Sequence, residues 1–247
     1  MSLKQVAASL GILPAARAAK RSVHRARVAF LEWRLGAPWA NGGSVMRRTY
    51  RDYEHYKEHQ KSKLDALGAS NVDAGLDAPL YRVLMERLAR YAFPRGTTVV
   101  CLAARRGGEV RAFIEHGCFA VGIDLNPGPE NQYVVVGDFH HLQFADGSVD
   151  VVFTNSLDHA LELDKVFAEV VRILKPGGRF LVETAYGFNE TDLPSHWEAT
   201  FWATTADLVE RISAHGLALV ERLDIEQPHK GVHLQFRSGA HAPAARA

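Results

Sequence analysis

The sequence predicts an α/β fold: a doubly wound, mostly parallel sheet with helices on both faces and an antiparallel hairpin at its C-terminal end. Short apolar runs rich in β-forming residues alternate with helical segments, a pattern typical of a parallel sheet that is covered on both sides. The expected strands are 98–102, 120–124, 133–136, 150–154 and 179–183. Two last strands, 217–225 and 232–237, are separated by a gap too short for a helical crossover, which predicts the hairpin.

The helices are predicted from the spacing of apolar residues and from the residues that end them. A helix over 78–93 places Leu80, Leu84 and Leu88 on one face and stops before Pro94. A polar helix with three tyrosines is expected over 50–67, whereas 184–203 is expected to be irregular. Further helices are expected near 109–116, 163–174 and 205–215.

The composition is that of a globular protein. The chain has 247 residues, with 29 lysines and arginines against 28 acids and 47% hydrophobic residues. That balance suits one domain, or one domain with an appendage, and excludes a disordered or fibrous chain. The two cysteines, Cys101 and Cys118, exclude a disulfide scaffold and a four-cysteine metal site, and we expect no metal. No apolar run approaches the roughly 18 residues of a membrane span, so a cytoplasmic protein is expected.

Positive charge gathers at the N-terminal end, where residues 1–50 hold nine lysines and arginines but one acid, Glu32. A helix over 15–35 would place Val23, Ala26, Phe30 and Trp33 on one face. The favoured interpretation is that this stripe packs on the main domain. The alternative is peripheral contact of residues 1–35 with an anionic membrane or a polyanionic acceptor. Because 36–43 is a glycine-rich break, the expected parts are a basic helical appendage (1–43), a main domain (44–238) and a disordered tail (239–247).

Two aspartates stand where a ligand is expected. In an open α/β sheet the ligand lies beyond the carboxyl ends of the strands. Asp124 ends the second predicted strand, 23 residues after Cys101, which is about the spacing at which a carboxylate meets a ribose diol. Asp138 follows the third strand, where an acceptor could bind the amino group of an adenine. Each aspartate alone could instead be a helix cap or a turn residue.

Four sequence segments occur in an informative order. They are VVCLAARRGGEV at 99–110, VGIDLNPG at 121–128, GDFHHLQFADGSVDVVFTNSLDHA at 137–160 and LKPGGRFLVE at 174–183. Together they resemble the class I, Rossmann-like S-adenosylmethionine-dependent methyltransferases. The resemblance implies that residues 44–238 form a methyltransferase domain and that its cofactor is S-adenosyl-L-methionine.

The resemblance also implies roles for single residues. Asp124 would bind the ribose hydroxyls, Asp138 the adenine amino group, and Phe139 would lie against the adenine. The other cofactor contacts would come from Ala103, Arg105, Gly107, Leu125 and Asn155. The first segment departs from the family pattern, since Cys101 replaces an acid and Ala103 and Arg105 replace two glycines. Arg105 or Arg106 could compensate by binding the carboxylate of the cofactor, or both could be solvated.

The segment after the fourth strand is expected to face the transferred methyl group. There His159 is the candidate general base, oriented by Asp158 or Glu162; the alternative is that it merely lines the pocket. The motif typical of nucleic-acid adenine methylation does not occur here, so a small-molecule or glycan acceptor is expected, with oxygen as the favoured acceptor atom. Aromatic residues between 186 and 202 are expected to bind this acceptor, and the helix over 50–63 could cover it.

Other functions remain open on the sequence alone. The altered glycine loop would also suit a catalytically inactive, methyltransferase-like binding or scaffold module. An RNA methyltransferase guided by residues 1–50 is a less favoured alternative. A nicotinamide enzyme is disfavoured because residues 103–108 lack the G-x-G-x-x-G pattern of a dinucleotide site.

Overall fold

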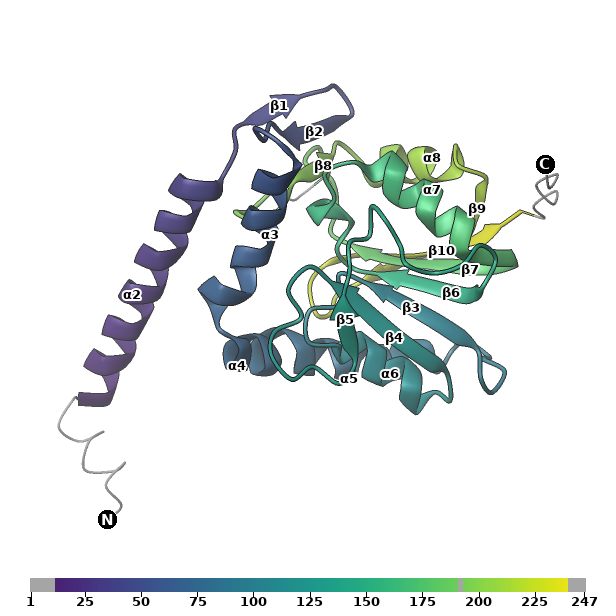
Figure 1. Cartoon of the computed structure of the whole chain (residues 1–247), viewed down its shortest axis with the longest axis horizontal. Coiled ribbons are helices and arrows are strands. Elements are labelled where there is room, and N and C mark those ends of the chain that lie inside the picture. Colours follow the sequence, from purple (N-terminus) through teal and green to yellow (C-terminus); the bar gives the residue numbers. More distant parts are fainter. Residues whose placement is uncertain (1–11, 191–192, 240–247) are drawn as a thin grey trace, which may run out of the picture.

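A computed structural model describes residues 12–190 and 193–239, and a sheet of seven strands forms the centre of this part of the chain (Figure 1). The strand order is β5-β4-β3-β6-β7-β10-β9. The first five strands pair in parallel, and β10 pairs antiparallel with both β7 and β9. The predicted fold class, including the closing hairpin, is therefore confirmed. The strands are β3 (Thr98–Leu102), β4 (Phe119–Asp124), β5 (Val134–Val136), β6 (Val149–Thr154), β7 (Leu174–Thr184), β9 (Leu217–Ile225) and β10 (Gly231–Ser238).

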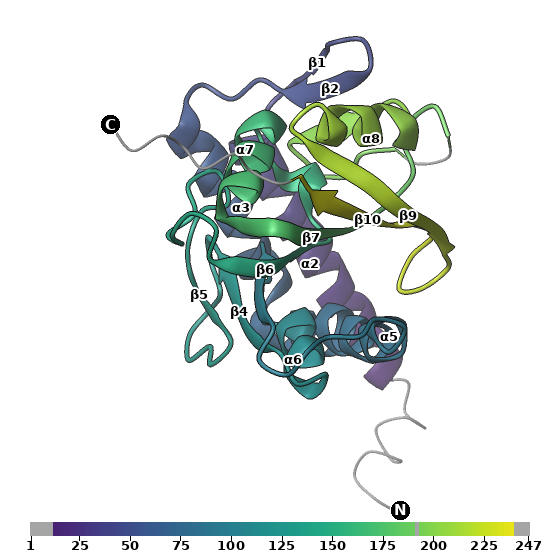
Figure 2. The same ribbon diagram turned by 90° about the vertical axis from the view of Figure 1, so that its right-hand side faces the viewer.

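Helices cover both faces of the sheet, because alternate strand residues point to opposite sides. In β3, Val99 and Cys101 pack in one buried cluster and Val100 and Leu102 in the other. The first cluster lies against α5 (Ala78–Leu88) and α6 (Gly108–Glu115), and the second against α7 (Leu163–Ile173) and α8 (Thr205–Ser213). Figure 2 shows the two helix pairs on either side of the sheet.

Two N-terminal helices lie beside this core. The 24-residue helix α2 (Ile12–Leu35) stands off the body, and α3 (Tyr53–Leu67) runs between α2 and the sheet (Figure 1). Asp52 caps α3, because its side chain accepts a hydrogen bond of 2.8 Å from the backbone N–H of His55. After α3 the chain continues through α4 (Ala69–Val72) and a π-helical turn, η1 (Asp73–Asp77), into α5. No helix among the described residues is both long enough and apolar enough to cross a bilayer.

The interpretation that the stripe of α2 packs on the main domain is wrong. Val23, Phe30 and Trp33 are 69%, 53% and 79% exposed. The residues that face the body are instead Leu31, which is half-buried, and Leu35, which is buried. The periodicity of the sequence identified an amphipathic helix, but it could not distinguish the face turned inward, since apolar residues occur on both.

A second, three-stranded sheet was not predicted. It consists of β1 (Trp39–Asn41), β2 (Val45–Arg48) and β8 (Thr200–Trp202), with antiparallel pairing throughout. The hairpin of β1 and β2 spans the predicted boundary between residues 43 and 44, and β8 ends the stretch that was expected to be irregular. The domain limits remain predictions, and residues 240–247 of the predicted tail lie outside the described part of the chain.

Candidate functional site

A cavity lies at the carboxyl ends of the parallel strands, as expected for an open α/β sheet. Its empty space is about 660 Å³ with the open mouth included. One wall comes from the loops after β3, β4, β5 and β6, and the other from α3 and Val72. The lining residues are Tyr56, Gln60, Lys63, Leu64, Leu67, Val72, Ala103, Arg105, Asp124, Leu125, Asn126, Gly137, Phe139, Ser156 and His159.

The loop after β3 keeps a glycine-type backbone although two of its three glycine positions are substituted. The φ angles are 53° at Ala103, 44° at Arg105 and 87° at Gly107, all in the left-handed region. An L-residue in that region costs roughly 1–2 kcal/mol. The surrounding structure must stabilise the loop, and it does so from the preceding turn: Asp77 accepts N–H groups of Arg106 and Gly108 at 3.1 and 3.3 Å.

Asp124 joins this loop to the end of β4. One of its carboxylate oxygens accepts the backbone N–H of Arg105 at 2.9 Å, and the other accepts the N–H of Asn126 at 2.7 Å. An ionised carboxylate offers about four acceptor sites. Half of that capacity is therefore left for a ligand, and the side chain lines the cavity.

The two neighbouring arginines have different surroundings. Arg106 lies against the outer turn, where Nε donates to Asp73 at 2.9 Å and Nη1 donates to the carbonyls of Pro127 and Pro129, each at 3.1 Å. Arg105 lines the cavity, and its buried Nε has no hydrogen-bond partner among the described residues. The nearest acid is Asp77, with Oδ1 3.6 Å away. Of these two arginines, Arg105 is therefore the one placed to receive an anionic group in the cavity.

Asp138 is occupied by protein groups and lies outside the lining of the cavity. Its Oδ2 accepts from the Tyr53 hydroxyl at 2.8 Å, and its Oδ1 accepts from the backbone and ring nitrogens of His140 at 3.0 and 2.9 Å. Burial raises the pKa of Asp138, but the hydrogen bonds from His140 and Tyr53 outweigh it and lower the pKa to about 2. Asp138 is thus an ionised anchor that holds α3 to the loop after β5.

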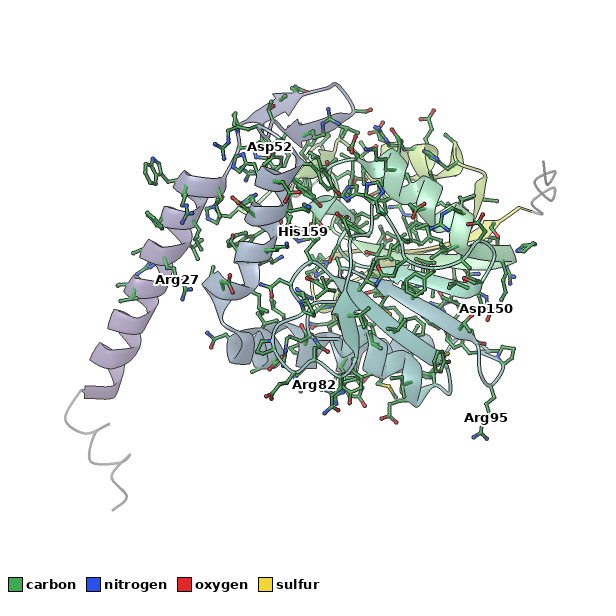
Figure 3. All side chains as sticks on the ribbon, in the orientation of Figure 1. Arg27, Asp52, Arg82, Arg95, Asp150 and His159 are labelled. Atoms are coloured by element: carbon green, nitrogen blue, oxygen red, sulfur yellow. The ribbon has the colours of Figure 1, made fainter. Side chains whose placement is uncertain are left out.

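His159 lies between α3 and the sheet, and it is fixed on both ring nitrogens (Figure 3). Nδ1 is 2.9 Å from the carbonyl oxygen of Trp197, which can only accept, so Nδ1 carries the proton. Nε2 is 2.9 Å from Nζ of Lys63. Burial, followed by the charge of Lys63, lowers the pKa of His159 to about 3. The lone pair of Nε2 therefore accepts a hydrogen bond from Lys63.

Lys63 lines the cavity but was not predicted from the sequence. Burial and the charge of Arg105 lower its pKa to about 8, although the nearby Asp158 acts in the opposite direction. One signal was available: Tyr56, Gln60, Lys63 and Leu67 recur at helical spacing, so they share one face of α3. The tyrosines indicated that this helix could cover the acceptor, but the face that lines the cavity was not identified from the sequence.

The remaining predicted residues fall into two groups. Ala103, Leu125 and Phe139 line the cavity together with Asp124, Arg105 and His159, whereas Gly107 and Asn155 lie outside its lining. The aromatic segment expected to bind the acceptor is turned elsewhere: Trp197 and Trp202 are buried at 7% and 0% exposure, which fits the filling of a core. In its place, α3 forms the wall opposite the sheet.

The family comparison matches residues 100–182 to a methyltransferase domain. Curated relatives include the sterol 24-C-methyltransferase erg6 of Schizosaccharomyces pombe, 29% identical over an alignment of length 164 that covers 55% of this chain and 43% of that protein. The malonyl-[acyl-carrier protein] O-methyltransferase of Methylococcus capsulatus is 32% identical over 113 residues, 42% of this chain and 41% of that protein. The chain thus spans less than half the length of these relatives.

Solved structures share the fold. A Burkholderia thailandensis 1,6-didemethyltoxoflavin-N1-methyltransferase, solved with its substrate and S-adenosylhomocysteine, has a TM-score of 0.60 at 17% identity and covers 82% of this chain and 100% of its own. The methyltransferase partner of the Haloferax volcanii Trm112 activator has a TM-score of 0.62 at 22% identity and covers 74% of this chain and 98% of its own.

Proposed function

Residues 100–182 form a class I methyltransferase domain with the Rossmann-like fold, and on this premise we propose that the protein transfers a methyl group from S-adenosylmethionine to an oxygen of a small acceptor. One observation carries the proposal. The loop after β3 holds left-handed φ angles at all three glycine positions and is joined to Asp124, the residue at the ribose position. A glycine-type backbone at positions that carry alanine and arginine favours a working cofactor site over a scaffold that has lost it.

The residues of the cavity fit the cofactor chemically. The free acceptor capacity of Asp124 suits two ribose hydroxyls, and the ring of Phe139 suits the flat adenine. The methionine end carries a carboxylate, and the guanidinium of Arg105, which lines the cavity and makes no side-chain hydrogen bond through Nε to any described residue, is a donor for it. Asp138 accepts three hydrogen bonds from protein groups and lies outside the cavity lining, so its role at the adenine amino group stays a prediction.

Lys63 and His159 are proposed to share the handling of the acceptor proton. When bound, S-adenosylmethionine supplies an electrophilic methyl group on a positively charged sulfur. A neutral Lys63 can donate one N–H to Nε2 of His159 and turn its lone pair to an acceptor hydroxyl in the cavity. His159 would then be a positioning residue, held by Trp197, and the general base would be Lys63.

The acceptor is proposed to be small and partly apolar. Leu64, Leu67, Val72 and Leu125 line the cavity, and apolar walls with few polar groups suit such a molecule better than a glycan, whose many hydroxyls each need a partner. Peripheral contact of residues 1–35 with an anionic membrane, the alternative that the sequence left open, is independent of this acceptor.

Calorimetric titration with S-adenosylmethionine and S-adenosylhomocysteine tests the cofactor site, and adjacent arginines provide a matched pair. Arg105→Ala should weaken binding at least about tenfold, since a hydrogen bond to a charged group contributes about 1.5–3 kcal/mol. Arg106→Ala should leave binding within about twofold, because its guanidinium is bound to the outer turn. If the unaltered protein bound neither compound, the enzymatic proposal would be wrong and the scaffold alternative would replace it.

A further inference from the structure

One face of the C-terminal half of α2 is apolar, and none of the residues that the structure describes covers it. Val23, Ala26, Phe30 and Trp33 recur at helical spacing and are all exposed, and the rings of Phe30 and Trp33 are in contact with their centroids 5.9 Å apart. Trp33 is 79% exposed, an unusual position for the largest apolar side chain. Clustered exposed apolar residues mark an interaction surface more often than scattered ones do.

The opposite face fixes the orientation of the helix. Leu35 is buried, and Glu32 forms an ion pair of 3.2 Å with the buried Arg48 of β2. The guanidinium of Arg48 also donates to the carbonyls of Ala37 and Glu198, at 2.7 and 2.8 Å. Since these contacts hold the inner face against the body, the apolar stripe stays directed outward.

Charge surrounds the stripe on the outer side. Arg27 and Arg34 are exposed beside this stripe, and Glu32, the one acid in the sequence of α2, is turned inward to Arg48. Figure 3 shows Arg27 on α2, away from the sheet. Long arginine side chains can reach lipid phosphates while tryptophan and phenylalanine rings enter the headgroup boundary. We call Val23, Ala26, Arg27, Phe30, Trp33 and Arg34 the basic-aromatic face.

We propose that the basic-aromatic face docks onto the surface of an anionic lipid bilayer. A membrane is favoured over a protein partner because exposed aromatic rings and exposed arginines occur together along a single helix at the edge of the described part of the chain.

Docking would also affect how an acceptor reaches the cavity, and only this consequence rests on the proposed function. α2 packs against α3, and α3 supplies five residues of the cavity lining: Tyr56, Gln60, Lys63, Leu64 and Leu67. Packed helices are separated by only about 8–10 Å. Two helix layers, α2 and α3, would therefore separate the cavity from the lipid, and a partly apolar acceptor could be drawn from the bilayer.

Cosedimentation of the full chain with vesicles tests the docking. Wild type should bind vesicles that contain phosphatidylglycerol in preference to vesicles of phosphatidylcholine alone, and added salt should weaken binding. Phe30→Ser/Trp33→Ser should lower the partition coefficient at least about tenfold. Arg27→Glu/Arg34→Glu should lower it about 25-fold or more, since one basic residue near such a surface contributes about fivefold.

Matched controls lie elsewhere on the surface. Phe119→Ser removes an aromatic side chain that is 75% exposed, and Arg82→Glu/Arg95→Glu reverses two exposed cations; both should bind vesicles within about twofold of wild type. The proposal would be overturned if wild type did not bind vesicles or bound both vesicle types equally. It would also be overturned if Phe30→Ser/Trp33→Ser bound as well as wild type. A dimer that this double variant dissociates would overturn it too, since a second copy would then cover the face. Titration with S-adenosylmethionine separates the two proposals, because a protein that binds vesicles but not the cofactor refutes only the enzymatic one.

Discussion

Replacing Glu109, which follows the loop after β3, with glutamine is predicted to remove a pH-dependent loss of stability. Glu109 lies in the first turn of α6 and is fully buried, and neither of its carboxylate oxygens accepts a hydrogen bond from another described residue. Burial raises the pKa of Glu109 to about 8, and the charge of Asp77 acts in the same direction. Glutamine has nearly the same shape but no charge at any pH.

The size of the effect follows from the two pKa values of this side chain. Its ordinary pKa is 4.5, and the folded protein raises it to about 8. The folded state therefore holds the proton more tightly, so the stability that this group contributes is complete below pH 4.5 and is lost as the pH rises towards 8. One pKa unit corresponds to about 1.36 kcal/mol, which makes the total loss on the order of 4–5 kcal/mol.

Urea unfolding followed by circular dichroism, at about pH 5 and about pH 8, measures this difference. Glu109→Gln and wild type should have similar free energies of unfolding at the lower pH, and the variant should be more stable by several kcal/mol at the higher pH. Glu115→Gln, at an exposed position of the same helix, is the control and should leave the pH dependence unchanged. A difference between Glu109→Gln and wild type that stays constant with pH would refute the argument.

Three further substitutions test other parts of the structure. Ala103→Gly should stabilise the fold by about 1 kcal/mol because φ there is 53°; a calorimetric Tm at or below that of wild type would contradict this. Arg87→Met should lower the free energy of unfolding in urea by about 3–5 kcal/mol, because it leaves the buried Glu183 without the arginine that pairs with it. A loss under about 1 kcal/mol would mean that this ion pair does not stabilise the fold. Tyr53→Phe removes a donor to Asp138 and should raise the pKa of that carboxyl from about 2, measured by NMR titration; an unchanged pKa would show that the hydrogen bond is not formed in solution.

The central sheet was predictable because its strands are continuous apolar runs. β9, at Leu217–Ile225, has the limits that the sequence predicted, and the short gap before β10 dictated antiparallel pairing. The three-residue strands β1 and β8 carry too few residues for a recognisable period, and β8 pairs with β2. That pairing of segments some 150 residues apart depends on tertiary packing rather than on local sequence.

The candidate site was only partly predictable. Asp124 was identified because it ends a strand, and a strand end fixes a position at the rim of the sheet. The engagement of Asp138 by Tyr53 joins residues 85 positions apart, so no local pattern contains it. Likewise, Lys63 stands in a polar helix, and its contact with His159 depends on which face of α3 is turned to the sheet.

A structure determined with S-adenosylhomocysteine bound tests the central claim most directly. The account predicts the ribose hydroxyls within hydrogen-bond distance of the Asp124 carboxylate, roughly 2.6–3.2 Å, and the amino acid carboxylate on Arg105. Electron density for the ligand in any other place, or a cavity closed by Arg105 and Lys63 with no ligand at saturating concentration, would contradict it.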